Sequence, residues 1–342
     1  MLYPKLNEAR TLIDLSGIWN LQLDDGNGFA EEWMKTHLPN PVQIAVPASY
    51  NDQIEGTDYR DHYGWVFYQK ELEIPKVILN QRIVLRFGAV THLAKVYLNG
   101  EFLCEHKGGF LPFEVEIQDI VKPGKNLLCV AADNKVNYGT LPIGNEEGAA
   151  FFGADLPDIP SVKKTKPKPH NIPNFDFFNY AGINRPVKIY TTPKSYIKDI
   201  VLVPEICGDN GVVRYEVDCL GTGNVKITVF DEDKNTVTSA EGKSGDLEIP
   251  NVHLWEPGNA YLYTARVEFG SDVYEETFGV RSVEIRGAQF LINGKPFYFK
   301  GFGKHEDSEI HGRGMDEALN VKDLSLMKWL SANSFRTAHY PY

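Results

Sequence analysis

The chain has 342 residues, of which 42% are hydrophobic and 24% are charged, and its formal net charge is −11. This length exceeds the usual size of one hydrophobic core, so we expect two or three folded domains rather than global disorder. The negative charge argues against nucleic acid and against an anionic lipid surface as partners, because both require a basic patch.

The cysteines and the start of the chain indicate a reducing compartment. The chain has no CxxC pair, and its four cysteines are widely spread, at Cys104, Cys129, Cys207 and Cys219. This spread predicts reduced, packed thiols. The first residues lack the basic start and apolar run of a secretory signal, and no later stretch reaches the length of a membrane span. A cytoplasmic protein is therefore expected.

From Leu15 to about Pro193, short alternating segments are separated by Gly, Pro, Asn and Asp, a pattern typical of β-strands. Branched and aromatic residues are frequent in these segments, for example from Gly64 to Pro75 and from Lys125 to Asn134. The clearest hairpin surrounds Asn99-Gly100, a dipeptide that supplies the positive φ angles of a type I′ turn. Many strands with little helical periodicity predict an antiparallel jelly roll or sandwich.

Residues 137–174 interrupt this pattern with frequent Pro and Gly and with a short basic run at residues 163–170. Such a composition predicts a long irregular loop, in which the lysines are solvated. The next segment, NFDFFNYAGIN at residues 174–184, gathers several aromatic residues around Asp176. Long loops inside compact domains are usually functional or mobile, which makes this region a candidate for the site.

A second β region runs from about Ser195 to Arg286, and its size and strand spacing suit an immunoglobulin-like sandwich. After Gly287 the pattern changes. A hairpin is predicted around Asn293-Gly294, Asp316 to Ala332 carries apolar residues at helical spacing, and residues 333–336 resemble a strand. Strand, helix, strand is the βαβ unit of an α/β domain, of which only the opening fits in the remaining length.

Motifs along the whole chain are similar to glycoside hydrolase family two, in particular to its β-glucuronidases. NSFRTAHYP at residues 333–341 resembles the family signature, and GFGKHED at residues 301–307 resembles a second motif, with Lys304 in place of the usual arginine. DFFNYAGI at residues 176–183 resembles the first-domain loop that reaches the active site in these enzymes. Three further stretches match, at residues 82–87, 105–110 and 253–258.

The resemblance implies a multidomain, mainly β fold. A jelly-roll sugar-binding domain is expected over residues 1–194 and an immunoglobulin-like β-sandwich over residues 195–286. Residues 287–342 are expected to form the first strands and helix of a (β/α)8 TIM barrel, which is incomplete in this chain. Family likeness also suggests a homo-oligomer, namely a tetramer, and no cofactor.

The implied activity is retaining hydrolysis of β-D-glucuronides to glucuronic acid and an aglycone by two glutamates. The acid/base glutamate of the family follows an asparagine late in the barrel, a place that neither Asn7-Glu8 nor Asn145-Glu146 fits. Both catalytic glutamates, and the Asn-x-Lys motif that recognises the substrate carboxylate, are therefore expected C-terminal to Tyr342. By itself, the chain is predicted to be inactive.

Asp176 is the first candidate for substrate binding, because a carboxylate can hold two sugar hydroxyls and the resemblance places it against the glucuronide ring. Its competing interpretation is a turn-capping aspartate. His339 follows a predicted barrel strand, where a neutral imidazole can bond a hydroxyl, although it could also be a packed histidine. His305 is expected to form a wall of the pocket. Arg336 is expected to orient carboxylates rather than to touch the sugar.

A group of potential metal ligands lies within a few positions, at His305, Glu306, Asp307 and His311. Their spacing matches no zinc or calcium pattern, and the family mechanism needs no metal, so no metal is predicted. Glu306 could be mistaken for a catalytic acid, but it lies on the first barrel strand and receives no role.

Two alternatives remain open from the sequence. A β-galactosidase or β-mannosidase of the same family would keep the fold and change the sugar. A non-catalytic carbohydrate-binding or scaffold module would keep the jelly roll without hydrolysis of its own. The Asn-x-Lys motif beyond Tyr342 would distinguish the glucuronidase from its relatives.

Overall fold

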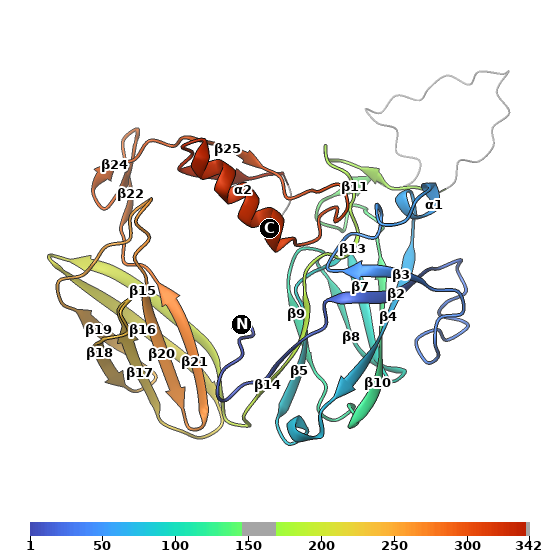
Figure 1. Cartoon of the computed structure of the whole chain (residues 1–342), viewed down its shortest axis with the longest axis horizontal. Helices are drawn as coiled ribbons and strands as arrows, with labels where there is room; N and C mark the ends of the chain where they lie inside the picture. Colours follow the sequence, from blue (N-terminus) through green and yellow to red (C-terminus); the bar gives the residue numbers. More distant parts are fainter. Residues whose placement is uncertain (146–168, 340–342) are drawn as a thin grey trace.

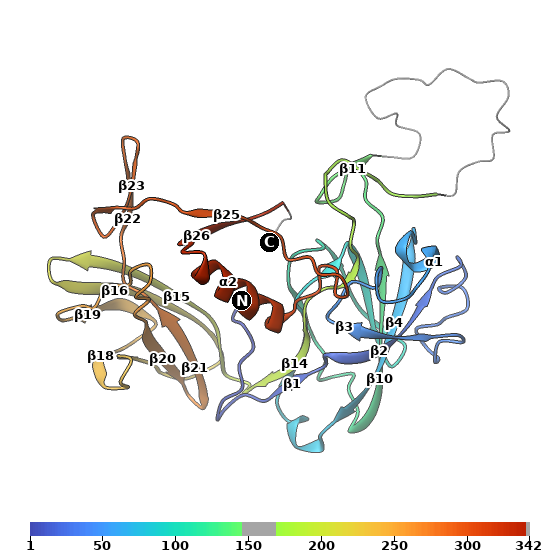
Figure 2. The same cartoon turned by 45° about the horizontal axis from the view of Figure 1, so that its top comes forward.

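The computed structural model describes residues 1–145 and 169–339. Figures 1 and 2 show two β regions lying side by side, with a short α/β segment above the space between them. This order confirms the predicted fold class, mainly β with the start of an α/β domain at the end. Within the described residues, no helix is long and apolar enough to cross a bilayer.

The first β region is a sandwich of two antiparallel sheets. Its six-stranded sheet has the order β3-β2-β4-β10-β7-β8, with bounds β2 Gly17–Leu23, β3 Val42–Val46, β4 Trp65–Ile74, β7 Leu93–Leu98, β8 Glu101–Lys107 and β10 Gly124–Asp133. Its four-stranded sheet has the order β1-β14-β5-β9, with bounds β1 Leu12–Asp14, β5 Arg82–Phe87, β9 Phe113–Glu116 and β14 Val187–Thr192. The facing side chains form one core, which includes Trp19, Tyr68 and Phe87.

The central strands β4 and β10 are buried along most of their length, unlike half-exposed β7 with its strict alternation. A second apolar cluster explains this burial, because Trp33, Met34 and Leu38 from the segment after β2 cover Phe67 and Cys129. Such cover on both faces accounts for the continuous apolar runs within these strands, WVFY at residues 65–68 of β4 and LLCVAA at residues 127–132 of β10.

Short elements complete this region. They are α1 Thr57–Arg60, the 3-10 turn η1 Lys76–Ile78, and two small strand pairs, β6 Val90–Thr91 with β13 Gly182–Ile183 and β11 Gly144–Asn145 with β12 Ile172–Pro173. The predicted Asn99-Gly100 turn is confirmed, because it joins β7 to β8 and both residues have positive φ. Most of the expected irregular loop, including nearly all of its basic run, falls at residues 146–168 and lies outside the described residues.

The second β region is also a two-sheet sandwich. One sheet has the order β15-β16-β19, with bounds β15 Tyr196–Cys207, β16 Asn210–Leu220 and β19 Ser244–Ile249. The other has the order β18-β17-β20-β21, with bounds β17 Val225–Phe230, β18 Thr236–Glu241, β20 Tyr263–Phe269 and β21 Asp272–Phe278. The alternating burial of β20 shows why its sequence alternates, since every second side chain enters the core.

A buried ion pair joins the start of the chain to the second sandwich. Arg10 donates from both Nε and Nη2 to Asp272, at 2.9 and 2.6 Å, and these side chains are only 3% and 0% exposed. Asp272 also accepts from the backbone N–H of Ile197, whose carbonyl accepts from Arg10. With every charge paired and hydrogen-bonded, this contact ties the two β regions together.

The last segment begins with a three-stranded antiparallel sheet, β22 Val283–Arg286, β23 Gln289–Ile292 and β24 Lys295–Pro296. It continues with β25 Gly301–Lys304, α2 Glu317–Trp329 and β26 Ser334–Thr337. β25 and β26 pair in parallel, which confirms the predicted βαβ unit. Asp316 caps α2 by accepting from the backbone N–H of Leu319 at 3.0 Å.

Burial along α2 differs from what its sequence suggests. Met327 is buried, but Leu324 and Leu330 of the same apolar stripe are 53% and 60% exposed. An α/β helix normally packs on a sheet of several strands, whereas among the described residues the parallel sheet of this segment consists of β25 and β26 alone. The helix was predicted correctly, while its packing depends on neighbours.

The four cysteines are free thiols. Cys129 is buried, and burial raises its pKa to about 12. Cys207 is exposed at the end of β15, so the expectation that all four thiols are packed is wrong at this position. The reason is its place at the end of the sheet, because Cys207 is the last residue of β15 and pairs with Asn210 across the β15–β16 turn.

Candidate functional site

The predicted substrate-binding residues Asp176 and His339 lie next to each other. Nδ1 of His339 is 3.3 Å from Oδ1 of Asp176, and both side chains are largely exposed. Asp176 belongs to the loop between β12 and β13 in the first sandwich, whereas His339 follows β26 in the last segment. The pair is therefore assembled from two parts of the molecule, as expected for a first-domain loop that reaches into another domain.

His305 joins this pair. It follows β25, and its ring lies edge-on to that of His339 with centroids 5.2 Å apart. Because β25 and β26 are parallel, their C-terminal ends meet at one edge, and this is the edge at which barrel enzymes place their sites. The strand order thus explains why His305, His339 and the Asp176 loop meet.

Arg336 lies on β26, opposite Gly303 of β25, and its side chain is exposed. It stands three residues before His339, on the strand that leads to the site. Its expected role in orienting carboxylates stays a prediction. Lys304, where the family motif usually has arginine, forms an ion pair of 3.0 Å with Asp323 and so links β25 to α2.

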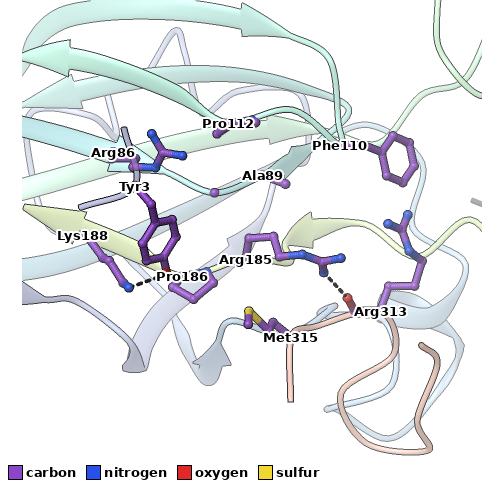
Figure 3. A pocket seen from close by; sticks show the side chains of 11 residues that line it. Tyr3, Arg86, Ala89, Phe110, Pro112, Arg185, Pro186, Lys188, Arg313 and Met315 are labelled. Carbon is purple, nitrogen blue, oxygen red and sulfur yellow. Dashed lines mark hydrogen bonds between the residues drawn. The ribbon is translucent and has the colours of Figure 1, made fainter. Parts of the chain in front are cut away.

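Glu306 makes a structural contact. Nη2 of Arg185 donates to both of its carboxylate oxygens, at 2.7 and 2.8 Å, and Arg313 lies 3.3 Å from Oε1. Arg185 also donates to the backbone carbonyl of Arg313 at 3.0 Å, the contact drawn in Figure 3. The Glu306 carboxylate, bound by two arginines, thus connects the first sandwich to the last segment. This contact fits a structural role for Glu306 and not a catalytic one.

The Arg313 guanidinium also lies 4.1 Å from the centre of the Phe110 ring. Arg185, Arg313 and Phe110 line a cavity of about 200 Å³ at this joint, shown in Figure 3. Neither Asp176 nor His339 lines it, so the cavity is separate from the candidate sugar site.

Three of the four clustered potential metal ligands face different partners. Glu306 binds arginines, His305 faces His339, and Nδ1 of His311 lies 3.4 Å from Asp316. Among residues 1–145 and 169–339, no group of three or more His, Cys, Asp or Glu side chains is arranged to hold a metal ion.

The sequence did not reveal which residues hold the Asp176 loop. His92 contacts Asn179, and Arg60 stacks on Phe178, although both partners of the loop lie far away in the chain. The sequence around His92 shows only the pattern of β-strands. No local pattern marks a histidine as the partner of a distant asparagine.

Comparison with known families matches three consecutive regions of the chain. Residues 12–193 match the sugar binding domain of glycosyl hydrolases family 2. Residues 195–281 match a second region described as glycosyl hydrolases family 2, and residues 283–342 match the TIM barrel domain of that family.

Individual relatives agree. A beta-glucuronidase from Paenibacillus borealis is 42% identical over 354 residues, covering 100% of this chain and 57% of that protein. The structure of a Faecalibacterium prausnitzii beta-glucuronidase is 53% identical with a TM-score of 0.93, over 100% of this chain and 58% of that one.

The structure of Bifidobacterium dentium beta-glucuronidase complexed with coumarin-3-O-glucuronide is 46% identical with a TM-score of 0.94, over 100% of this chain and 60% of that one. The chain thus spans a little over half the length of the relatives that it matches. Because the sugar binding domain alone accounts for residues 12–193, and the other two regions follow in order, the chain belongs to glycosyl hydrolases family 2.

Proposed function

We propose that the protein to which this chain belongs hydrolyses β-D-glucuronides with retention of configuration, releasing glucuronic acid and an aglycone. The observation that carries the proposal is the 3.3 Å approach of Asp176 to His339 at the C-terminal edge of the parallel strands. A related structure holds coumarin-3-O-glucuronide, and another, from Ruminococcus gnavus, holds D-glucuronic acid.

In this proposal Asp176 accepts hydrogen bonds from two hydroxyls of the sugar ring. A carboxylate suits this task, because its oxygens are strong acceptors and fix the directions of both hydroxyls. His339, oriented by Asp176, bonds a further hydroxyl, and His305 forms a wall of the pocket. Arg336 orients carboxylates beside the sugar.

The chemistry requires two carboxyl groups about 5 to 5.5 Å apart, one as acid and then base, the other as nucleophile. Glu306 is bound by arginines, and Asp176 in this proposal binds sugar hydroxyls, so neither is assigned these tasks. We place both catalytic glutamates C-terminal to Tyr342. The role of this chain is to hold and orient the sugar.

Release of p-nitrophenol tests the proposal. We expect a protein that continues through the whole barrel to hydrolyse p-nitrophenyl β-D-glucuronide, and this chain alone to release nothing. The β-D-galactoside and β-D-mannoside serve as controls for the sugar. Faster hydrolysis of either control would show that the substrate is not a glucuronide. Release of p-nitrophenol by the chain alone would overturn the placement of the catalytic groups.

We further propose the functional division 1–194, 195–286 and 287–342. The sheets support the first boundary, because no strand pairing among the described residues crosses position 194, whereas the pairing of β22 with β23 crosses the second boundary. Limited proteolysis tests it, since cuts are expected first near these boundaries.

We also propose a cytoplasmic homotetramer. Free thiols at all four cysteines are consistent with a reducing compartment. Light scattering of the longer protein tests the assembly, and a monomer would contradict it. Fractionation of the cells that produce the protein tests the compartment, where recovery outside the cytoplasm would contradict the proposal.

A further inference from the structure

The loop that carries Asp176 is held by a set of contacts with the first sandwich, which we call the loop anchor. Its members are His92, Asn134 and Asn179. We infer that Asn179, fixed between His92 and Asn134, is a positioning residue that sets Asp176 against His339. This inference rests on the proposed function of Asp176 as a substrate-binding residue.

The first step is the amide of Asn179, which is bonded at both ends. Its Oδ1 lies 2.7 Å from Nε2 of His92, and its Nδ2 donates to the backbone carbonyl of Asn134 at 3.0 Å. Because the acceptor end faces the imidazole and the donor end faces the carbonyl, only one orientation of the amide satisfies both contacts.

The second step is the protonation state of His92, a residue that is only 3% exposed. Burial lowers the pKa of this imidazole to about 4, and the hydrogen bond with Asn179 acts in the opposite direction. The ring is therefore neutral near pH 7. Its Nδ1 is buried and has no hydrogen-bond partner among the residues that the structure describes, so the proton belongs on Nε2, from which it is donated to Asn179.

The third step is the rest of the loop. The Arg60 guanidinium lies 3.9 Å from the centre of the Phe178 ring and forms an ion pair with Asp52. The backbone N–H of Ala181 donates to Oδ1 of Asn51 at 2.9 Å. Phe178, directly before Asn179, and Ala181, two residues after it, are thus both held by residues of the segment 51–60 in the first sandwich.

The fourth step connects the anchor to the site. Asp176 lies between Phe175 and Phe177, whose rings stack with centroids 4.4 Å apart, and it is three residues before Asn179. The Asp176 side chain is 74% exposed, and its one ion pair within the described part of the chain is with His339 of the last segment. Its position relative to the barrel strands therefore depends on where the anchored residues that follow it hold the loop.

A double-mutant cycle on the longer, active protein tests this inference. Asp176→Asn and Asn179→Ala are made singly and together, and kcat/KM is measured on p-nitrophenyl β-D-glucuronide. We expect Asn179→Ala alone to lower kcat/KM about tenfold, the size of one lost hydrogen bond. In the Asp176→Asn background the same change should have little effect, because the residue acts through Asp176.

The outcomes separate the two proposals. Wild-type kcat/KM for Asp176→Asn would overturn the substrate-binding role itself. The positioning role alone would be overturned if Asp176→Asn lowered kcat/KM and Asn179→Ala lowered it about tenfold further in that background. As a matched control, Asn126→Ala removes another buried asparagine that donates to two backbone carbonyls, at the opposite end of β10, and should leave kcat/KM unchanged.

His92 provides a second route if Asn179→Ala does not fold. The amide nitrogen of glutamine reaches about as far from the backbone as Nε2 of histidine, so His92→Gln can still donate to Asn179. We expect His92→Leu to lower kcat/KM about tenfold and His92→Gln to restore most of it. Equal activity of the two variants would overturn the inference.

Discussion

The first sandwich and the last α/β segment differ in how completely they bury their apolar side chains. The first sandwich has a continuous core from both sheets, in which Trp19 is 1% exposed. In the last segment Trp329, Phe302 and Phe335 are 78%, 45% and 46% exposed. The contrast follows from topology, because an antiparallel sandwich encloses its own core, whereas parallel strands need cover on both faces.

The difference also divides the site. Asp176 comes from a loop that the first sandwich holds by its own contacts, while His305 and His339 come from strands whose surroundings are still open. One half of the proposed site is thus supported within this chain, whereas the other half lies on a parallel sheet of two strands among the described residues.

The largest expected effect concerns the core of the first sandwich. Trp19 packs edge-on to Tyr68 and donates its indole N–H to the carbonyl of Leu15. We expect Trp19→Ala to lower the free energy of unfolding by about 3–5 kcal/mol in urea titrations. Its neighbour Ile18, on the opposite face of β2, is 58% exposed, and Ile18→Ala should change the value by less than about 0.5 kcal/mol.

A loss of similar size in both variants would contradict the division of β2 into a buried and an exposed face.

The next effect concerns pH. Folding lowers the pKa of His92 from 6.5 to about 4, so the unfolded chain binds a proton that the folded chain excludes between these values. Stability is therefore lost as the pH falls from about 6.5 to about 4, by about 3 kcal/mol in total, and the loss is complete below that range.

Urea titrations of the wild type and of His92→Gln across this range isolate the contribution of His92. Burial also lowers the pKa of His62, but this group is present in both proteins and cancels in the comparison. The prediction would be contradicted if the free energy of unfolding of the two proteins changed with pH by the same amount across this range.

The smallest effect is expected in the last segment. Trp329→Ala in this chain should change the free energy of unfolding by less than about 0.5 kcal/mol, because the side chain is 78% exposed. In a protein with the complete barrel, the same change should cost about 3 kcal/mol if neighbouring elements cover the indole. A large loss in the short chain would show that α2 is already packed.

Much of the local structure was predictable. The two Asn-Gly turns, at Asn99-Gly100 and Asn293-Gly294, have the positive φ angles that their sequence requires. The helix capped by Asp316 and the strand that precedes His339 also lie where the pattern indicated. These features depend on interactions between residues a few positions apart, which a single sequence contains.

The motifs likewise indicated both Asp176 and His339 as candidates, although the sequence alone does not say that they meet. Strand order and register decide that meeting, because the parallel pairing of β25 with β26 brings His305 and His339 to the edge that the Asp176 loop reaches.

The sequence by itself determined the elements and the turns, because these follow from spacing and local backbone preference, and its motifs indicated the candidate side chains through their resemblance to the family. The tertiary structure alone decided the bond of His92 to Asn179, the arginines around Glu306 and the exposure of Leu324. Each of these depends on segments that are distant in the chain, and their proximity exists only once the sheets have formed.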